Sequence, residues 1–189
     1  MLLRAIFAKI IATEMKKAFI LLTFALTVGI SAAAQSARSE RLAGHVYYFA
    51  SDSLRGRAAG SADAAKARDY IVERYKECGL KPLSAGSYMV PFKREGKDYT
   101  DVVAVIEGNS LKDEYIVLGA HYDHLGVKSG RIYPGADDNA SGVTALLSIA
   151  RICNAMRADG RGPRKNILFV CFDGKELDMA GSRHFVRRL

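Results

Sequence analysis

The sequence predicts an α/β protein, a three-layer α/β/α sandwich built on a mostly parallel mixed sheet. Short apolar runs rich in β-branched residues alternate with longer segments of helical periodicity in its second half. Two of these runs are almost unbroken in apolar residues, which is typical of strands covered on both faces. Polar clusters follow the runs at their carboxyl ends, where α/β sheets carry their binding sites.

The first part of the predicted domain consists of two helices. Apolar residues recur at three- and four-residue spacing over 39–52, which indicates an amphipathic helix. After a turn-rich link, Ser61 or Asp63 can cap a second helix. We expect that helix to end near Cys78, because Gly79 is a typical C-terminal stop.

The rest of the domain alternates between strands and helices. Three β-like runs come first, then a long and well-buried helix, another apolar strand, and a helix that is still running at the last residue. This order predicts helices on both faces of one sheet. The strands are expected at 88–92, 101–106, 115–120 and 166–172, and the helices at 141–156 and from Gly181 onward.

Residues 15–34 have the pattern of a secretory signal peptide. Two lysines precede an apolar run, and three alanines then supply the small residues of a cleavage site before Gln35. The alternative is a transmembrane anchor, but the run is shorter than the roughly 20 residues that a span needs. We therefore expect an exported protein, periplasmic or extracellular, with no stable membrane span after cleavage. Residues 1–14 are interpreted as an upstream start artefact, and 35–189 as the domain.

The composition is that of an ordinary globular domain, with 49% hydrophobic and 25% charged residues and a formal net charge of +8. The lysines and arginines are scattered and do not gather with aromatic residues, so we expect no nucleic-acid partner. The cysteines are few and two lie in apolar patterns, which indicates neither a disulfide framework nor a thiolate metal site. They are Cys78, Cys153 and Cys171.

Three polar clusters follow predicted strands or precede the long helix. In the pair His121 and Asp123, an imidazole can bind a metal while a carboxylate orients the ring. Asp137 and Asp138 precede the long helix, where capping is the simpler explanation, and Glu176 alone could be a solvated loop residue. Taken together, imidazole and carboxylate ligands without thiolates favour a catalytic zinc site over a structural one.

The motifs in which these residues stand resemble those of the M28 family of zinc aminopeptidases. They are GAHYDHLG at 119–126, GADDNASG at 135–142 and GKE at 174–176, with GS at 181–182. The segment that begins LRGR at residue 54 also resembles the part that precedes the catalytic core in that family. Order and spacing are kept over most of the predicted domain.

The resemblance implies a site for two zinc ions and peptide substrates. His121 would bind one ion, Asp137 would bridge both and Glu176 would bind the other. Asp123 would orient His121, and the bond from Asp137 to Asp138 would be a cis peptide. The implied activity is removal of N-terminal residues from peptides by metal-activated water.

Lys175 departs from the family pattern, because it stands where the family has the glutamate that acts as general base. An ammonium group has no lone pair and cannot accept a proton. Two neighbouring dications would lower the pKa of Lys175, and a neutral lysine could then serve as the base. Lys175 is therefore a candidate catalytic residue together with Asp123, whereas His124 is expected either behind the ligands or facing the substrate.

The family also has a further acidic ligand and a later histidine, which would fall beyond Leu189. We therefore expect 35–189 to be the N-terminal part of a longer M28-type domain. Two other functions remain open. One is a catalytically inactive metal-binding or scaffold relative, suggested by Lys175, and the other is cyclisation of N-terminal glutamine on the same fold.

Overall fold

The computed structural model describes residues 35–36, 38–84 and 86–188, so the predicted start artefact and signal peptide lie outside the described residues. The chain divides into two compact units, Met1–Arg41 and Leu42–Leu189. The second unit contains the mixed sheet and the helices that pack on it. No helix in the described ranges is long and apolar enough to cross a membrane.

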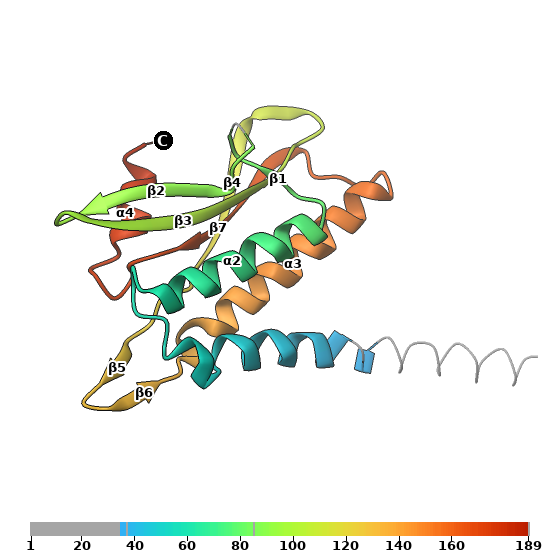
Figure 1. Cartoon of the computed structure of the whole chain (residues 1–189). Helices are drawn as coiled ribbons and strands as arrows, with labels where there is room; N and C mark the ends of the chain where they lie inside the picture. Colours follow the sequence, from blue (N-terminus) through green and yellow to red (C-terminus); the bar gives the residue numbers. More distant parts are fainter. Residues whose placement is uncertain (1–34, 37, 85, 189) are drawn as a thin grey trace, which may run out of the picture. The chain divides into compact units, whose positions relative to one another are not determined.

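The two N-terminal helices form as predicted (Figure 1). The first is helical through Phe49 and is followed by a short 3-10 turn, η1 (Asp52–Leu54). The second is α2 (Ala62–Glu77), whose N-cap is Ser61. The Ser61 hydroxyl accepts a hydrogen bond of 3.0 Å from the backbone N–H of Ala64, which satisfies a donor at the start of the helix.

A mixed sheet forms the centre of the unit, with strand order β1-β3-β7-β4 and β2 paired to β3. Only the β4–β7 pair is parallel among the described strands, so the sheet is mixed as predicted but less parallel than expected. A tight turn at Glu95 and Gly96, both with positive φ, folds β2 and β3 into an antiparallel hairpin. The strands are β1 (Lys81–Pro82), β2 (Met89–Arg94), β3 (Lys97–Ile106), β4 (Leu111–His121) and β7 (Lys165–Phe172).

Helices cover both faces of this sheet, which gives the predicted three layers (Figure 1). The helices α2 and α3 (Ser141–Ala158) share the larger apolar core with the sheet. On the other face, Phe185 of α4 (Ala180–Val186) packs against Val103, Leu168 and Val170. The helices α2, α3 and α4 begin within one residue of the expected positions. The first helix ends at Phe49, before the expected residue 52, and α4 ends at Val186, although the sequence predicted a helix still running at the last residue.

The strand β4 is not covered on both faces, which corrects the prediction from its apolar sequence. Tyr115, Ile116 and Val117 are 57%, 45% and 43% exposed. The reason is position in the sheet: among the described strands, β4 pairs only with β7 and lies at the edge. The apolar run therefore indicates a strand correctly but overestimates its burial.

Between β4 and α3 the chain makes a small hairpin that the sequence did not predict. It consists of β5 (Gly126–Lys128) and β6 (Arg131–Tyr133). The distorted turn η2 (Ala136–Ala140) follows and leads directly into α3. This excursion brings the GADDNASG segment back to the carboxyl end of β4.

Candidate metal centre

The candidate site lies where the parallel strands β4 and β7 end. His121 is the last residue of β4 and is in register with Phe172 at the end of β7. Parallel strands end on the same edge of a sheet, so the loop after β7 carries Lys175 and Glu176 to the side of His121. The turn η2, which precedes α3, supplies a carboxylate to the same place.

That carboxylate is Asp138 and not Asp137. The His121 Nε2 atom lies 3.1 Å from Asp138 Oδ1. Asp137 is exposed, and its backbone carbonyl accepts a hydrogen bond from the Ser141 hydroxyl. The cis peptide is also one residue later than expected, between Asp138 and Asn139.

The local backbone explains this shift of one residue. Asp138 and Asn139 have non-helical dihedral angles, which break the turn just before α3. The Asn139 side chain accepts a hydrogen bond of 3.1 Å from the Gly142 N–H and so acts at the start of the helix. Capping is thus assigned to Asn139, and Asp138 is left to face the site.

Asp123 is fully buried and holds the loop that carries Lys175 and Glu176. Its two carboxylate oxygens accept hydrogen bonds from the backbone N–H of Lys175 at 3.0 Å and of Glu176 at 3.1 Å. His121 Nδ1 donates a hydrogen bond of 3.0 Å to the Asp123 main-chain carbonyl, whereas the Asp123 carboxylate lies 3.7 Å from the same nitrogen. Asp123 therefore positions both His121 and the loop after β7.

The same hydrogen bond selects the tautomer of His121. A carbonyl oxygen can only accept, so Nδ1 carries the proton and the neutral ring keeps its lone pair on Nε2, toward Asp138. Burial opposes the charged ring, but contacts with Asp123 and the nearby Asp138 raise the pKa of His121 above its ordinary value.

Lys175 lies between the two carboxylates of the site. Its Nζ atom is 2.9 Å from Glu176 Oε1 and 3.2 Å from Asp138 Oδ2. The hydrogen bond to Glu176, followed by that to Asp138, raises the pKa of Lys175 above its ordinary value. Burial alone would raise the pKa of Asp138, but its contacts with Lys175 and the two histidines lower it. At neutral pH the site thus holds an ammonium group between two carboxylates.

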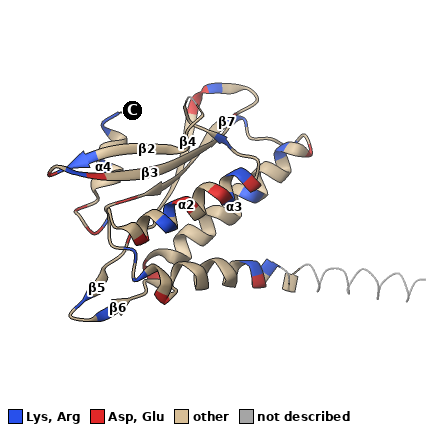
Figure 2. Cartoon of the chain, in the orientation of Figure 1, with Lys and Arg blue, Asp and Glu red and all other residues tan. Residues whose placement is uncertain are grey.

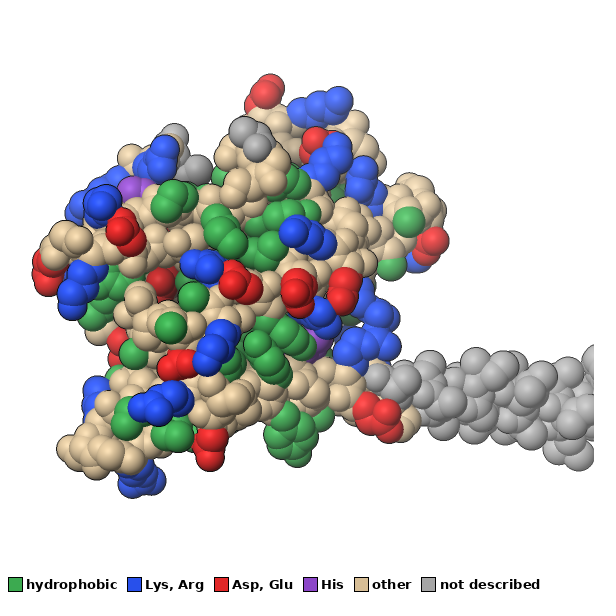
Figure 3. Space-filling view, in the orientation of Figure 1, with side chains coloured by type: hydrophobic (Ala, Val, Ile, Leu, Met, Phe, Trp, Pro, Cys, Tyr) green, Lys and Arg blue, Asp and Glu red, His purple; other side chains and the backbone are tan. Residues whose placement is uncertain are grey.

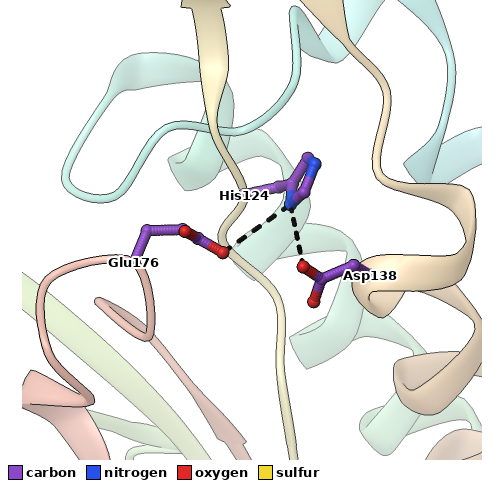
Figure 4. Close-up of side chains that lie close together, drawn as sticks. All are labelled: His124, Asp138 and Glu176. Atoms are coloured by element: carbon purple, nitrogen blue, oxygen red, sulfur yellow. Dashed lines mark ion pairs between the residues drawn. The ribbon is translucent and has the colours of Figure 1, made fainter.

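His124 joins this group, although the sequence assigned it no role. Figure 4 shows its ring directed at Asp138 and Glu176, and Nδ1 is 3.8 Å from an oxygen of each. One ligand atom from each of these three residues lies within 4.8 Å of the others. Burial, partly opposed by Asp138, lowers the pKa of His124, which favours the neutral imidazole that binds metals.

Arg57 is a residue of the site that sequence reasoning missed. Its side chain is completely buried and donates hydrogen bonds to four main-chain carbonyls, those of Phe49, Tyr122, Pro134 and Gly135. Burial lowers its pKa to about 10, against the opposing effect of Asp123 and Asp138. A fully buried arginine is rare without such partners, and only its place in the LRGR segment pointed to it.

A second acidic pair lies beneath the site. Asp101 of β3 and Asp173 after β7 are 0% and 3% exposed, and Asp101 Oδ1 accepts a hydrogen bond of 2.9 Å from the Asp173 N–H. Burial raises the pKa of Asp101 to about 7 and that of Asp173 to about 6. Asp173 is the first residue after β7, two residues before Lys175, so the pair contributes to the stability of this loop.

A hollow of about 280 Å³ opens beside His121 and Lys175. Its wall includes polar side chains, such as Asn139 and Lys175, and apolar ones, such as Phe172 and Met179, so a molecule with polar and apolar parts would fit it. The lining residues include Gly119, Asn139, Phe172, Met179 and Ser182. On the face of the described residues that Figures 2 and 3 show, lysines and arginines are interspersed with acidic side chains.

The residues of the site fit a zinc ion. They offer imidazole nitrogens and carboxylate oxygens without thiolates, the donor set of catalytic zinc. A buried histidine nitrogen, His124 Nδ1, has no hydrogen-bond partner in the described residues and points at the two carboxylates. An ion between these groups would satisfy the nitrogen and relieve the repulsion of the carboxylates.

Comparisons with known proteins agree with this geometry. Human transferrin receptor protein 2 is 32% identical over 93 residues, which are 49% of this chain and 11% of the receptor. Aminopeptidase YwaD of Bacillus subtilis is 32% identical over 90 residues, 47% of this chain and 18% of that protein. The chain therefore spans less than a fifth of the length of these curated relatives.

The fold is shared with solved structures. A zinc aminopeptidase from Bacillus subtilis, BSAP, superposes with a TM-score of 0.59 at 16% identity, over 78% of this chain and 65% of that one. The model of peptidase family M28 matches residues 101–189, which include all the candidate ligands. Residues 101–189 of this chain are therefore similar to peptidase family M28.

Proposed function

We propose that this protein is an exported zinc-dependent aminopeptidase, which removes N-terminal residues from peptides. The observation that carries the proposal is a meeting of imidazole and carboxylate groups inside the region that matches the M28 model. His121 lies 3.1 Å from Asp138, and Asp138, Glu176 and His124 each place one ligand atom within 4.8 Å of the others. The names of YwaD and BSAP support the reaction class and the metal. Support for export is the signal-like sequence of residues 15–34.

The side chains of the site would have two roles, metal binding and positioning of the ligands. His121 Nε2 and the carboxylates of Asp138 and Glu176 would hold the metal, and two ions are proposed by analogy with the family. Bound zinc supplies a Lewis acid and makes water a nucleophile at neutral pH. Asp123 keeps the two ligand loops together through its hydrogen bonds to the Lys175 and Glu176 amides.

Lys175 determines how protons can move in this site. Its charged Nζ can donate a proton to a leaving amine, but it can accept one only after it has lost one. The raised pKa of Lys175 makes that loss unfavourable while Asp138 and Glu176 remain its partners. A catalytic cycle therefore requires Lys175 to separate from these carboxylates.

The same residue favours a second candidate function, a metal-binding relative without catalysis. Asp138 and Glu176 already have a permanent positive partner in Lys175. The name of transferrin receptor protein 2 describes a receptor, which supports the view that relatives of this sequence serve other roles.

Zinc content and turnover of the purified full-length protein test the proposal together. We expect stoichiometric zinc and hydrolysis of at least some members of a panel of aminoacyl-arylamides. A panel of peptides with N-terminal glutamine would detect cyclisation instead. Stoichiometric zinc without turnover, unchanged in Lys175→Glu, would refute the peptidase. Activity that appears only in Lys175→Glu would establish the natural protein as the inactive relative.

A further inference from the structure

His124 has a buried ring nitrogen without a partner. Its side chain is 9% exposed, and Nδ1 makes no hydrogen bond to any described residue. The carboxylate oxygens Asp138 Oδ2 and Glu176 Oε1 each lie 3.8 Å from Nδ1, beyond hydrogen-bonding range. Buried polar groups in folded proteins are nearly always satisfied, so this nitrogen requires an explanation.

Two features of the fold restrict the position of the His124 ring: a hydrogen bond of its own backbone and the close approach of Gly135. The backbone N–H of His124 donates to the carbonyl of Arg57 at 3.0 Å. On the other side, Gly135 lies so close that a Cβ there would be 2.5 Å from His124 Cδ2. Arg57 also donates to the Gly135 carbonyl at 3.1 Å, so one buried arginine fixes both neighbours of the ring. These contacts restrict the movement of the His124 ring, and with it the position of Nδ1.

The distances around the nitrogen suit a metal ion. Ligands at about 2.0–2.1 Å from a tetrahedral zinc are about 3.4 Å from one another. The separations of 3.8 Å from Nδ1 to each carboxylate need only a small contraction to meet this value. Figure 4 shows the three side chains converging on one point from three separate segments of the chain.

We propose that His124 is a metal ligand, whose Nδ1 atom forms a divalent-cation site with Asp138 and Glu176. This inference rests on the proposed metal site and adds a second histidine to it. The ligand class is zinc or a similar divalent ion that accepts nitrogen and oxygen donors. Lys175 contacts the same two oxygens, Asp138 Oδ2 and Glu176 Oε1, and has to leave when the ion enters.

The test compares His124→Ala and His124→Asn with the wild type and with His45→Ala as a matched control. His45 is a histidine outside the site, with Nδ1 2.7 Å from the Tyr70 hydroxyl. Zinc affinity is measured by competition with a chromophoric chelator, and the fold of each metal-free variant by circular dichroism. X-ray absorption of the zinc-loaded proteins counts the imidazoles in the ion's shell.

We expect both His124 variants to lose affinity by about tenfold or more, with fewer imidazoles per zinc, while His45→Ala is unchanged in both. If His124→Ala folds poorly, the asparagine variant decides. Unchanged affinity and imidazole count in a folded variant would overturn the inference and leave the metal site of His121, Asp138 and Glu176 standing. Lower affinity with an unchanged imidazole count would make His124 a positioning residue and also overturn it. No zinc binding by the wild type would refute the proposed function itself.

Discussion

Replacing Lys175 with methionine is expected to tighten zinc binding. The ammonium group lies 2.9 Å from Glu176 and 3.2 Å from Asp138, the two carboxylates that would hold the ion. Zinc has to displace this group and then remains near its positive charge. Methionine keeps much of the length of the side chain but removes the charge. In the variant, Asp138 and Glu176 therefore have no ammonium partner that zinc must displace.

The size of the effect depends on the exposure of the pair. The side chains of Lys175 and Asp138 are 38% and 50% exposed, so water screens their attraction. Ion pairs of this kind contribute about 0.2–1 kcal/mol each. Two of them give about 0.4–2 kcal/mol, which corresponds to roughly 2- to 30-fold in zinc affinity.

Chelator competition at constant ionic strength measures the change, and Lys81→Met is the matched control. Lys81 forms a similar exposed ion pair, 2.9 Å from Glu107, outside the candidate site. We expect Lys175→Met to bind zinc more tightly and Lys81→Met to match the wild type. Equal affinity in all three proteins would show that the ammonium group does not compete with the ion and would refute the reasoning.

Two further predictions concern the support of the site. Arg57→Met removes the donor of two buried and two part-buried main-chain carbonyls, so we expect a loss of about 2–6 kcal/mol in the free energy of unfolding, measured by urea denaturation. A change below about 1 kcal/mol, the usual scale of a surface substitution, would contradict the role assigned to Arg57. Asp101 has a folded pKa of about 7, above its unfolded value, so the folded state binds the extra proton between these pKa values. The wild type should therefore lose stability as pH rises from about 4 to 7, and Asp101→Asn should show a flatter profile with a relative gain at pH 8. An unchanged profile in a folded Asp101→Asn variant would refute that account of the buried pair.

Local sequence signals predicted most of the elements correctly. Ser61 and Gly79 marked the ends of α2 because capping chemistry is local, and the apolar runs marked β3, β4 and β7. The sequence could not reveal which strand lies at an edge, since burial depends on neighbours in the sheet. The exposed face of β4 is the result.

In the candidate site too, the sequence predicted the features that depend on local motifs and missed those that depend on tertiary contacts. Order and spacing pointed to His121 and Glu176 as candidate ligands, but two adjacent aspartates could not be told apart by pattern alone. The backbone at Asp138 and Asn139 decides which carboxylate faces His121. Arg57 was not recognised as part of the site, and His124 was expected there only behind the ligands or facing the substrate. Both residues contact the turn at Pro134 and Gly135, which is distant in sequence from Arg57.

Comparison of Asp138→Asn with Asp137→Asn tests the metal centre most directly. Both variants remove one negative charge from the same turn, and only Asp138 contacts His121 and Lys175. The measurement is zinc stoichiometry and affinity of the purified protein, with circular dichroism to confirm folding. We predict that Asp138→Asn loses zinc binding and Asp137→Asn keeps it. Retention by Asp138→Asn together with loss by Asp137→Asn would contradict the assignment of Asp138 as the ligand.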